Sequence, residues 1–134
     1  MPITSRSSQS RRSFISVIAA AVGALIMGRT GSAQNRRDFT VVARRYTYSV
    51  NGTNSSEIRV MQNDLVHITF STEDIPHSFT IEEAPYRIMK RAQSGAPVSF
   101  SFRADQPGTF RFFCNLTAEE GCRDMQGTLI VTAG

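Results

Sequence analysis

The sequence has no apolar run long enough to cross a bilayer. Its longest such run covers residues 14–27, which is shorter than the about 20 residues that a transmembrane helix needs. Arg11 and Arg12 precede this run, and small residues at positions 31–33 suit cleavage by a signal peptidase. The pattern is typical of a twin-arginine export signal. We therefore expect residues 1–33 to be cleaved and the protein to be periplasmic or otherwise extracytoplasmic; an uncleaved signal would tether it to the membrane.

The exported part of the chain also lacks an excess of charge of either sign. The whole sequence holds 15 basic and 11 acidic residues, and its formal net charge is +4. Four of the basic residues and none of the acidic residues lie within positions 1–33, so the remainder carries eleven of each sign. A near-neutral surface offers no general attraction for nucleic acid or anionic membranes. We expect neither as a partner.

Residues 34–134 contain no internal repeat and no segment with the periodicity of a long amphipathic helix. Alternation of apolar and polar residues dominates instead, and it is typical of antiparallel strands that place one face on a core. Turn-forming residues separate the alternating runs, while residues 84–94 show no clear pattern. We predict strands at 39–50, 57–61, 64–71, 77–83, 97–103, 109–114 and 127–132.

The number and spacing of these strands predict the fold class. About a hundred residues are enough for one domain with one core and too few for two. Short strands at regular intervals, with turn signals between them, are typical of sandwiches and barrels. We therefore predict that residues 34–134 form one all-β domain, a Greek-key β-sandwich or barrel of about seven to eight strands.

Four side chains are candidate ligands for one metal ion: His77, Cys114, Cys122 and Met125. Strand parity directs His77 and Cys114 toward the core side, at strand ends where a sandwich gathers its loops. Thiolate, thioether and imidazole groups favour copper, whereas methionine is a poor ligand for zinc, calcium or magnesium. Taken singly, an inward histidine is more often a core residue and a methionine is more often filler. The other histidine, His67, alternates with an apolar strand face and is expected at the surface.

Three motifs in the chain resemble those of the cupredoxin family. They are DIPHSFTI at 74–81, PGTFRFFC at 107–114 and MQGTLIV at 125–131, with NDLV at 63–66 before the first of them. The resemblance covers nearly all of the chain after residue 33. It implies a Greek-key β-sandwich with one buried copper ion, and many members of the family carry single electrons. It also implies that His77 is the first histidine ligand, Cys114 the cysteine ligand and Met125 the axial methionine.

The chain departs from the family at the second histidine ligand. Mononuclear blue-copper members have a histidine between the cysteine and the methionine, whereas here no histidine follows His77 and Cys122 lies in the corresponding loop. The similar binuclear copper domain of cytochrome oxidase subunit II has two closely spaced cysteines and a later histidine. Ala118 occupies the place of that second cysteine. The motifs therefore match neither a standard blue site nor a binuclear one.

Three roles for Cys122 remain open. It can replace the missing histidine, which gives copper one nitrogen and three sulfurs and favours Cu(I). It can form a disulfide with Cys114, as an even cysteine count outside the cytoplasm suggests. Alternatively, Glu119 or Glu120 coordinates the metal and Cys122 does not. Twin-arginine transport handles proteins that fold in the reducing cytoplasm, which favours the first role.

These features together predict an exported mononuclear copper-binding protein that transfers single electrons or carries copper. Its partner would be a redox protein or a copper donor or acceptor protein, and we expect a monomer. The alternative is a metal-free interaction module in which a Cys114–Cys122 disulfide closes the loop at 116–121. A copper enzyme has the least support, because the sequence shows no nucleophile–base pair and no second metal constellation.

Overall fold

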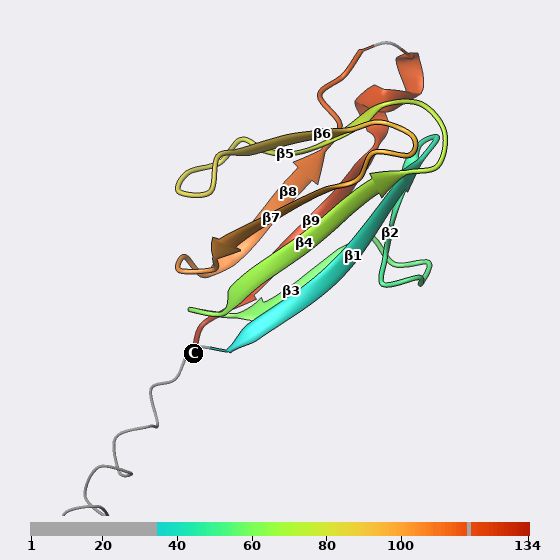
Figure 1. Cartoon of the computed structure of the whole chain (residues 1–134). Coiled ribbons are helices and arrows are strands. Elements are labelled where there is room, and N and C mark those ends of the chain that lie inside the picture. Colours follow the sequence, from blue (N-terminus) through green and yellow to red (C-terminus); the bar gives the residue numbers. More distant parts are fainter. Residues whose placement is uncertain (1–34, 118) are drawn as a thin grey trace, which may run out of the picture. The chain divides into compact units, whose positions relative to one another are not determined.

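The computed structural model describes residues 35–117 and 119–134, which form a two-layer β-sandwich (Figure 1). The predicted export signal at 1–33 lies outside these residues. A 3-10 helix, η3 (Glu120–Asp124), precedes the last strand. The strands are β1 (Arg36–Arg44), β2 (Thr47–Val50), β3 (Glu57–Met61), β4 (Leu65–Thr72), β5 (His77–Ile81), β6 (Ile88–Ala92), β7 (Val98–Arg103), β8 (Gly108–Phe113) and β9 (Gln126–Thr132).

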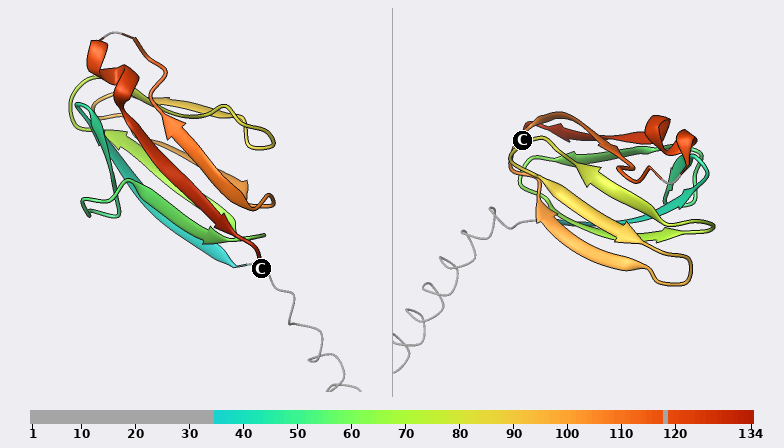
Figure 2. Two further views of the ribbon diagram at one scale, coloured as in Figure 1. Left: turned by 180° about the vertical axis from the view of Figure 1, so that it is seen from behind. Right: turned by 90° about the horizontal axis from the view of Figure 1, so that it is seen from above.

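The strands form two sheets that pack face to face (Figure 2). The four-stranded sheet has the order β2-β1-β4-β7, and the five-stranded sheet has the order β3-β9-β8-β5-β6. The predicted Greek-key sandwich is confirmed, and the expected antiparallel pairing holds for most strand pairs but not for two of them. β1 pairs with β4 in parallel, and β3 pairs with β9 in parallel. In each pair the two strands are far apart in the sequence, and the chain between them returns to the same end of the sandwich. Alternation reports which face of a strand is buried and says nothing about its direction.

Strand β4 shows how alternation builds the core. Val66, Ile68 and Phe70 are fully buried, while the residues between them are half-buried on the outer face. On that outer face, Nδ1 of His67 lies 2.8 Å from Oγ of Ser101 on β7. The expected placement of His67 away from the core is therefore confirmed.

Aromatic side chains from both sheets fill the core next to the ligand-bearing strand ends. The rings of Phe79 and Phe112 stack at 4.5 Å between centroids, and the ring of Tyr48 meets Phe112 edge-on at 5.0 Å. Phe70 packs against Phe79 at 6.0 Å. These contacts tie β2 and β4 of one sheet to β5 and β8 of the other, so the strands that lead into the ligand loops have fixed positions.

Two stretches differ from the predicted strands. The strand predicted at 39–50 is divided into β1 and β2, because the chain turns at residues 45–46 and the Arg45 N–H donates to Asp74 Oδ2 at 2.8 Å instead of continuing a ladder. Residues 84–94, which had no assignment, contain β6. Its sequence does not alternate cleanly, and its pairing with β5 defines it as a strand. The structure thus has nine strands in its described part, where seven to eight were expected.

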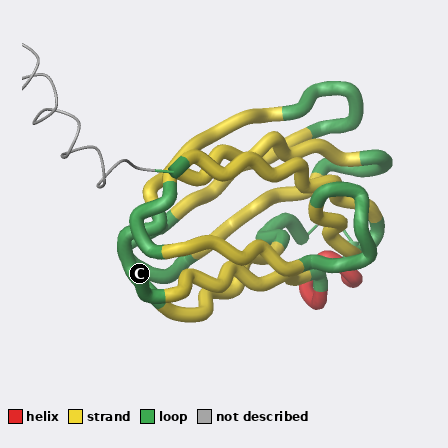
Figure 3. The backbone as a smooth tube through the Cα atoms, turned by 90° about the horizontal axis from the view of Figure 1, so that it is seen from below, coloured by secondary structure: helices red, strands yellow, loops and turns green. Residues whose placement is uncertain are grey.

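The loops gather at the two ends of the sandwich (Figure 3). η3 lies at the end opposite the C-terminus (Figure 1). The same end carries the start of β5 and the end of β8, since β8 runs antiparallel to both β5 and β9. The candidate ligands therefore meet at one end of the domain.

Candidate metal centre

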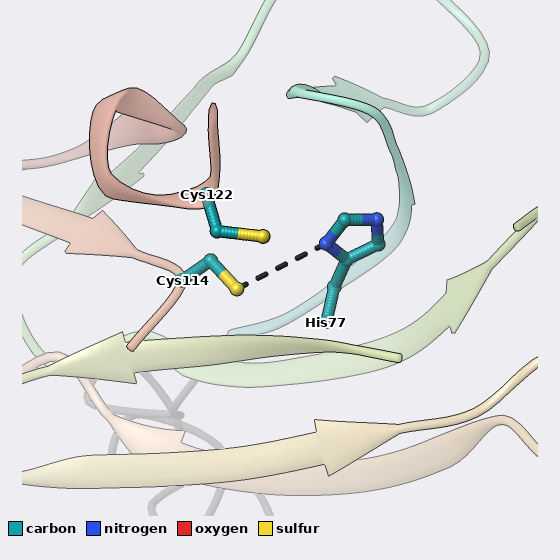
Figure 4. Close-up of side chains that lie close together, drawn as sticks. All are labelled: His77, Cys114 and Cys122. Carbon is teal, nitrogen blue, oxygen red and sulfur yellow. Dashed lines mark hydrogen bonds between the residues drawn. The ribbon is translucent and has the colours of Figure 1, made fainter. Parts of the chain in front are cut away.

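Three of the four candidate ligands converge in the structure. His77 begins β5, Cys114 follows β8 and Cys122 lies in η3. The His77 ring and the two Sγ atoms offer ligand atoms that all lie within 4.8 Å of one another. Figure 4 shows both sulfurs and one ring nitrogen pointing into the same space. Cys114 is 3 % exposed, and the other two side chains are fully buried. The predicted inward orientation of His77 and Cys114 is thus confirmed.

The separations within this group suit a first-row metal ion. Bonds of about 2.0 Å to nitrogen and about 2.3 Å to sulfur place a nitrogen and a sulfur ligand roughly 3.5 to 3.7 Å apart in trigonal or tetrahedral geometry. Cys114 Sγ lies 3.9 Å from Nδ1 of His77. Small side-chain adjustments would bring both atoms into bonding range. The donor set, one imidazole and two thiols, also fits a soft ion such as copper.

Asp74 orients the imidazole of His77. Its Oδ1 lies 2.9 Å from Nε2, so in the neutral ring Nε2–H donates to the carboxylate and the Nδ1 lone pair faces the sulfurs. Partial desolvation acts to raise the pKa of Asp74. Hydrogen bonds from the Arg45 N–H, the His77 ring and the Ile75 N–H outweigh it, and the pKa lies below its usual value. Asp74 is therefore a carboxylate that fixes the orientation of the His77 ring, a candidate metal ligand.

Strand β5 also holds Cys114 in place. The Ser78 N–H donates to Cys114 Sγ at 3.4 Å. The side chain of Ser78 exchanges two hydrogen bonds with Asn115, at 2.8 and 2.7 Å, while its carbonyl accepts from the Tyr48 hydroxyl at 2.6 Å. The loop that follows Cys114 is thus fastened to the residue next to His77, which fixes the distance between these two candidate ligands.

Cys122 reaches the same space from η3. Its N–H donates to the Glu119 carbonyl at 3.2 Å, at the start of the helix. Burial, together with the neighbouring thiol of Cys114, raises the pKa of Cys122, so the thiol form is favoured until a cation is present. Both cysteines are free thiols in the structure. The structure therefore contains no Cys114–Cys122 disulfide among its described residues.

Met125 is fully buried beside the two cysteines. Its N–H donates to the Cys122 carbonyl at 3.3 Å, and its carbonyl accepts from the Cys114 N–H at 3.3 Å. The main chain at Met125 therefore joins the two cysteine segments to each other. The role of its sulfur as a fourth, weak ligand remains a prediction from the sequence.

The carboxylates that were alternative ligands lie outside the converging group. Glu119 accepts from Nε of Arg45 at 2.8 Å, from Nη2 of Arg45 at 3.1 Å and from the Tyr46 hydroxyl at 2.7 Å. These bonds hold the pKa of Glu119 below its usual value. Glu120 is exposed. Among the described residues, the histidine, cysteine and acidic side chains that converge are His77, Cys114 and Cys122 alone.

Sequence reasoning missed the residues that support the ligands. Asp74 was detectable, because it stands three residues before His77 within the same motif, and a carboxylate is a frequent partner of a metal-bound histidine. Arg45 and Tyr46 carried no such signal, since more than seventy residues separate them from Glu119. Contacts of that range follow from the fold.

A family model described as a cupredoxin-like domain matches residues 17–131 of this chain. The fold is similar to that of a chain in a heme-copper terminal oxidase dimer, with a TM-score of 0.64 and 18 % identity over 94 % of this chain and 99 % of the other. It is also similar to the periplasmic domain of subunit II of cytochrome oxidase (CoxB) of Bradyrhizobium japonicum. There the TM-score is 0.62 and the identity 15 %, over 72 % and 83 % of the two chains.

Rusticyanin from Thiobacillus ferrooxidans is a third similar structure, with a TM-score of 0.55 and 18 % identity over 75 % of this chain and 79 % of rusticyanin. At such identities these likenesses establish the fold.

Among proteins with curated functions, none matches the sequence. Within the described residues, no helix has the length and apolar character needed to cross a membrane.

Proposed function

The chain belongs to the cupredoxin-like domain family, and on that premise we propose that it is an exported protein that binds one copper ion and either transfers single electrons or carries the metal. One observation carries the proposal: Nδ1 of His77 and the thiols of Cys114 and Cys122 converge in a buried space. Export by the twin-arginine route is part of this proposal and rests on the pattern in residues 1–33.

Each candidate ligand has a defined role in the proposed site. His77 would hold copper through Nδ1, since Nε2 is paired with Asp74. Cys114 would supply the principal thiolate, Cys122 a second one in place of the absent histidine, and Met125 a weak thioether contact. Two thiolates and a thioether form a soft donor set, which stabilises Cu(I) relative to Cu(II).

The partner of the proposed site is a redox protein or a copper donor or acceptor. A single buried ion suits one-electron transfer, because packed ligands move little when the metal changes charge. Carriage instead requires the ion to leave the site. No enzymatic activity is proposed, and the chain is expected to act as a monomer.

We expect the protein purified from its export compartment to contain about one copper per chain and Cys122→Ser to retain far less. Serine removes one of the two thiolates, and the remaining imidazole, thiolate and thioether hold a soft ion less tightly. Elemental analysis measures the copper content of the native protein and of the variant, and free thiols are counted in the same samples. Copper retained unchanged by Cys122→Ser contradicts the four-ligand site. Protein with neither copper nor free thiols supports the disulfide-closed interaction module instead.

Asp74→Asn is expected to weaken copper binding by about 10- to 100-fold, the usual effect of removing the carboxylate behind a metal-bound histidine. Asparagine removes the negative charge, and its amide can face Nε2 in the wrong sense, so the imidazole is less well oriented. Competition with a Cu(I) chelator of known affinity measures the change.

The matched control is Asp38→Asn, which removes one carboxylate from an exposed pair with Arg36 at 2.9 Å. This variant is expected to bind copper as the unmodified protein does. Equal affinity for the two variants would show that Asp74 has no role in orienting His77.

A further inference from the structure

The candidate ligands are enclosed, so an ion cannot reach them unless part of the site moves. His77, Cys122 and Met125 are fully buried, and Cys114 is nearly so. Of the three segments that carry the converging atoms, two are tied into the sandwich: β5 lies between β8 and β6, and the Cys114 loop is fastened to Ser78. The remaining segment, η3, is a short helix that brings Cys122 in from outside the sheets (Figure 4).

The turn between β1 and β2 holds η3 in place. Arg45 binds the Glu119 carboxylate through two nitrogens, and the Tyr46 hydroxyl binds the same carboxylate at 2.7 Å. Glu119 is the N-cap residue directly before η3, and its carbonyl accepts from the Cys122 N–H. The side chains of Arg45 and Tyr46 therefore bind the chain at Glu119, three residues before the proposed ligand Cys122.

The Tyr46 ring also makes a close packing contact with Gly121 of η3. A Cβ at position 121 would lie 2.6 Å from three carbons of the Tyr46 ring, so the ring rests directly on the glycine that precedes Cys122. Any side chain larger than hydrogen would push the ring away. The hydroxyl and the ring of Tyr46 thus make separate contacts with η3, one polar and one by packing.

The same turn is joined to the histidine side of the site. Asp74 accepts from the Arg45 N–H through Oδ2 and binds His77 through Oδ1. The contacts run without a break from Glu119 through Arg45 and Asp74 to His77. At the surface, the side chains of Arg45 and Glu119 are 45 % and 32 % exposed. Ion pairs in such positions stabilise weakly, so breaking the contact between Arg45 and Glu119 costs little free energy.

We propose that Arg45, Tyr46 and Glu119 form a latch that holds η3, and with it Cys122, over the other two ligands and sets how fast metal enters and leaves the site. The three latch residues are positioning residues and touch no metal themselves. When the latch opens, η3 moves away with one thiol, while His77 and Cys114 stay with the sandwich. The identity of the ion as copper rests on the proposed function; the latch itself does not.

The test measures the accessibility of the thiols in the reduced protein without metal, under anaerobic conditions. We expect a thiol reagent to label Glu119→Gln and Tyr46→Phe about five- to tenfold faster than the unmodified protein, because each variant removes hydrogen bonds to or from a charged group. Gly121→Ala is expected to act in the same direction while leaving the ion pair chemically intact. In copper-loaded protein, the same variants should release Cu(I) to a chelator faster by a similar factor.

Two controls separate the latch from general loss of stability. Glu57→Gln removes the carboxylate of an exposed ion pair with Arg59, at 2.6 Å on β3, and should leave the labelling rate unchanged. Val60→Ala truncates a buried side chain on β3 and destabilises the domain away from η3. Labelling that follows the unfolding free energy of each variant, with Val60→Ala as reactive as Glu119→Gln, overturns the latch. Equal rates for the latch variants and the unmodified protein overturn it too.

The two proposals fail in different ways. Thiol labelling needs no metal, so it decides the latch even if the protein retains no copper. Loss of copper from the unmodified protein counts against the proposed function alone. Copper release that is unaffected by the latch variants, in protein that does hold copper, counts against the latch alone.

Discussion

Cys122→His is expected to turn the copper-loaded protein blue. The substitution supplies the second histidine that mononuclear blue-copper cupredoxins have in this loop, and it removes the second thiolate that favours Cu(I). A site with one thiolate from Cys114, two imidazoles and the thioether of Met125 would then suit Cu(II). The expected signature is an intense thiolate-to-Cu(II) charge-transfer band in the visible spectrum of the oxidised protein, which the unmodified protein should lack or show weakly.

The histidine must fit a fully buried position, so some loss of stability is expected, of about 1 to 3 kcal/mol. Cys122→Ser is the matched control, since it removes the same thiol and adds no imidazole. The double variant Cys114→Ser, Cys122→His keeps the new imidazole without the principal thiolate and should stay colourless. A Cys122→His variant that binds Cu(II) with no such band would show that Cys122 does not occupy the ligand position.

Phe79→Ala is expected to lower the free energy of unfolding by about 3 to 5 kcal/mol, the range for removing a large aromatic side chain from a packed core. Phe79 is fully buried, and its ring stacks on Phe112 at 4.5 Å and contacts Phe70 and Phe100 at 6.0 and 5.4 Å. The gap left by alanine would lie between the two sheets. Urea denaturation followed by circular dichroism measures the change.

Met89→Ala is the control for this prediction. Met89 lies on β6, which pairs with the strand that carries Phe79, but its side chain is 59 % exposed. Removing an exposed side chain should change the free energy of unfolding by less than about 0.5 kcal/mol. A Phe79→Ala variant that loses no more stability than Met89→Ala would show that the aromatic cluster does not hold the two sheets together.

Alternation in the sequence was enough to predict most strands of the fold. In β4, β7 and β8 the buried residues are those that alternation assigns to the core, because side chains of a strand point to opposite faces with a period of two. The same rule gave the inward direction of His77 and Cys114. It failed at β6 and at the turn after Arg44, where pairing with neighbouring strands and a bond to Asp74 decide the structure.

For the candidate site, residue identities alone were enough to predict the chemistry of the donors and their order along the chain: an imidazole, two thiols and a thioether in motifs of one family. That Cys122 lies with His77 and Cys114 as a free thiol follows from the folded arrangement of the chain. The same arrangement pairs Glu119 with Arg45 and Tyr46. Residue type and local periodicity act over a few residues. The distance between Cys122 and His77 depends on how the two sheets pack and where distant loops meet. The hydrogen bonds between the β1–β2 turn and Glu119 depend on the same packing.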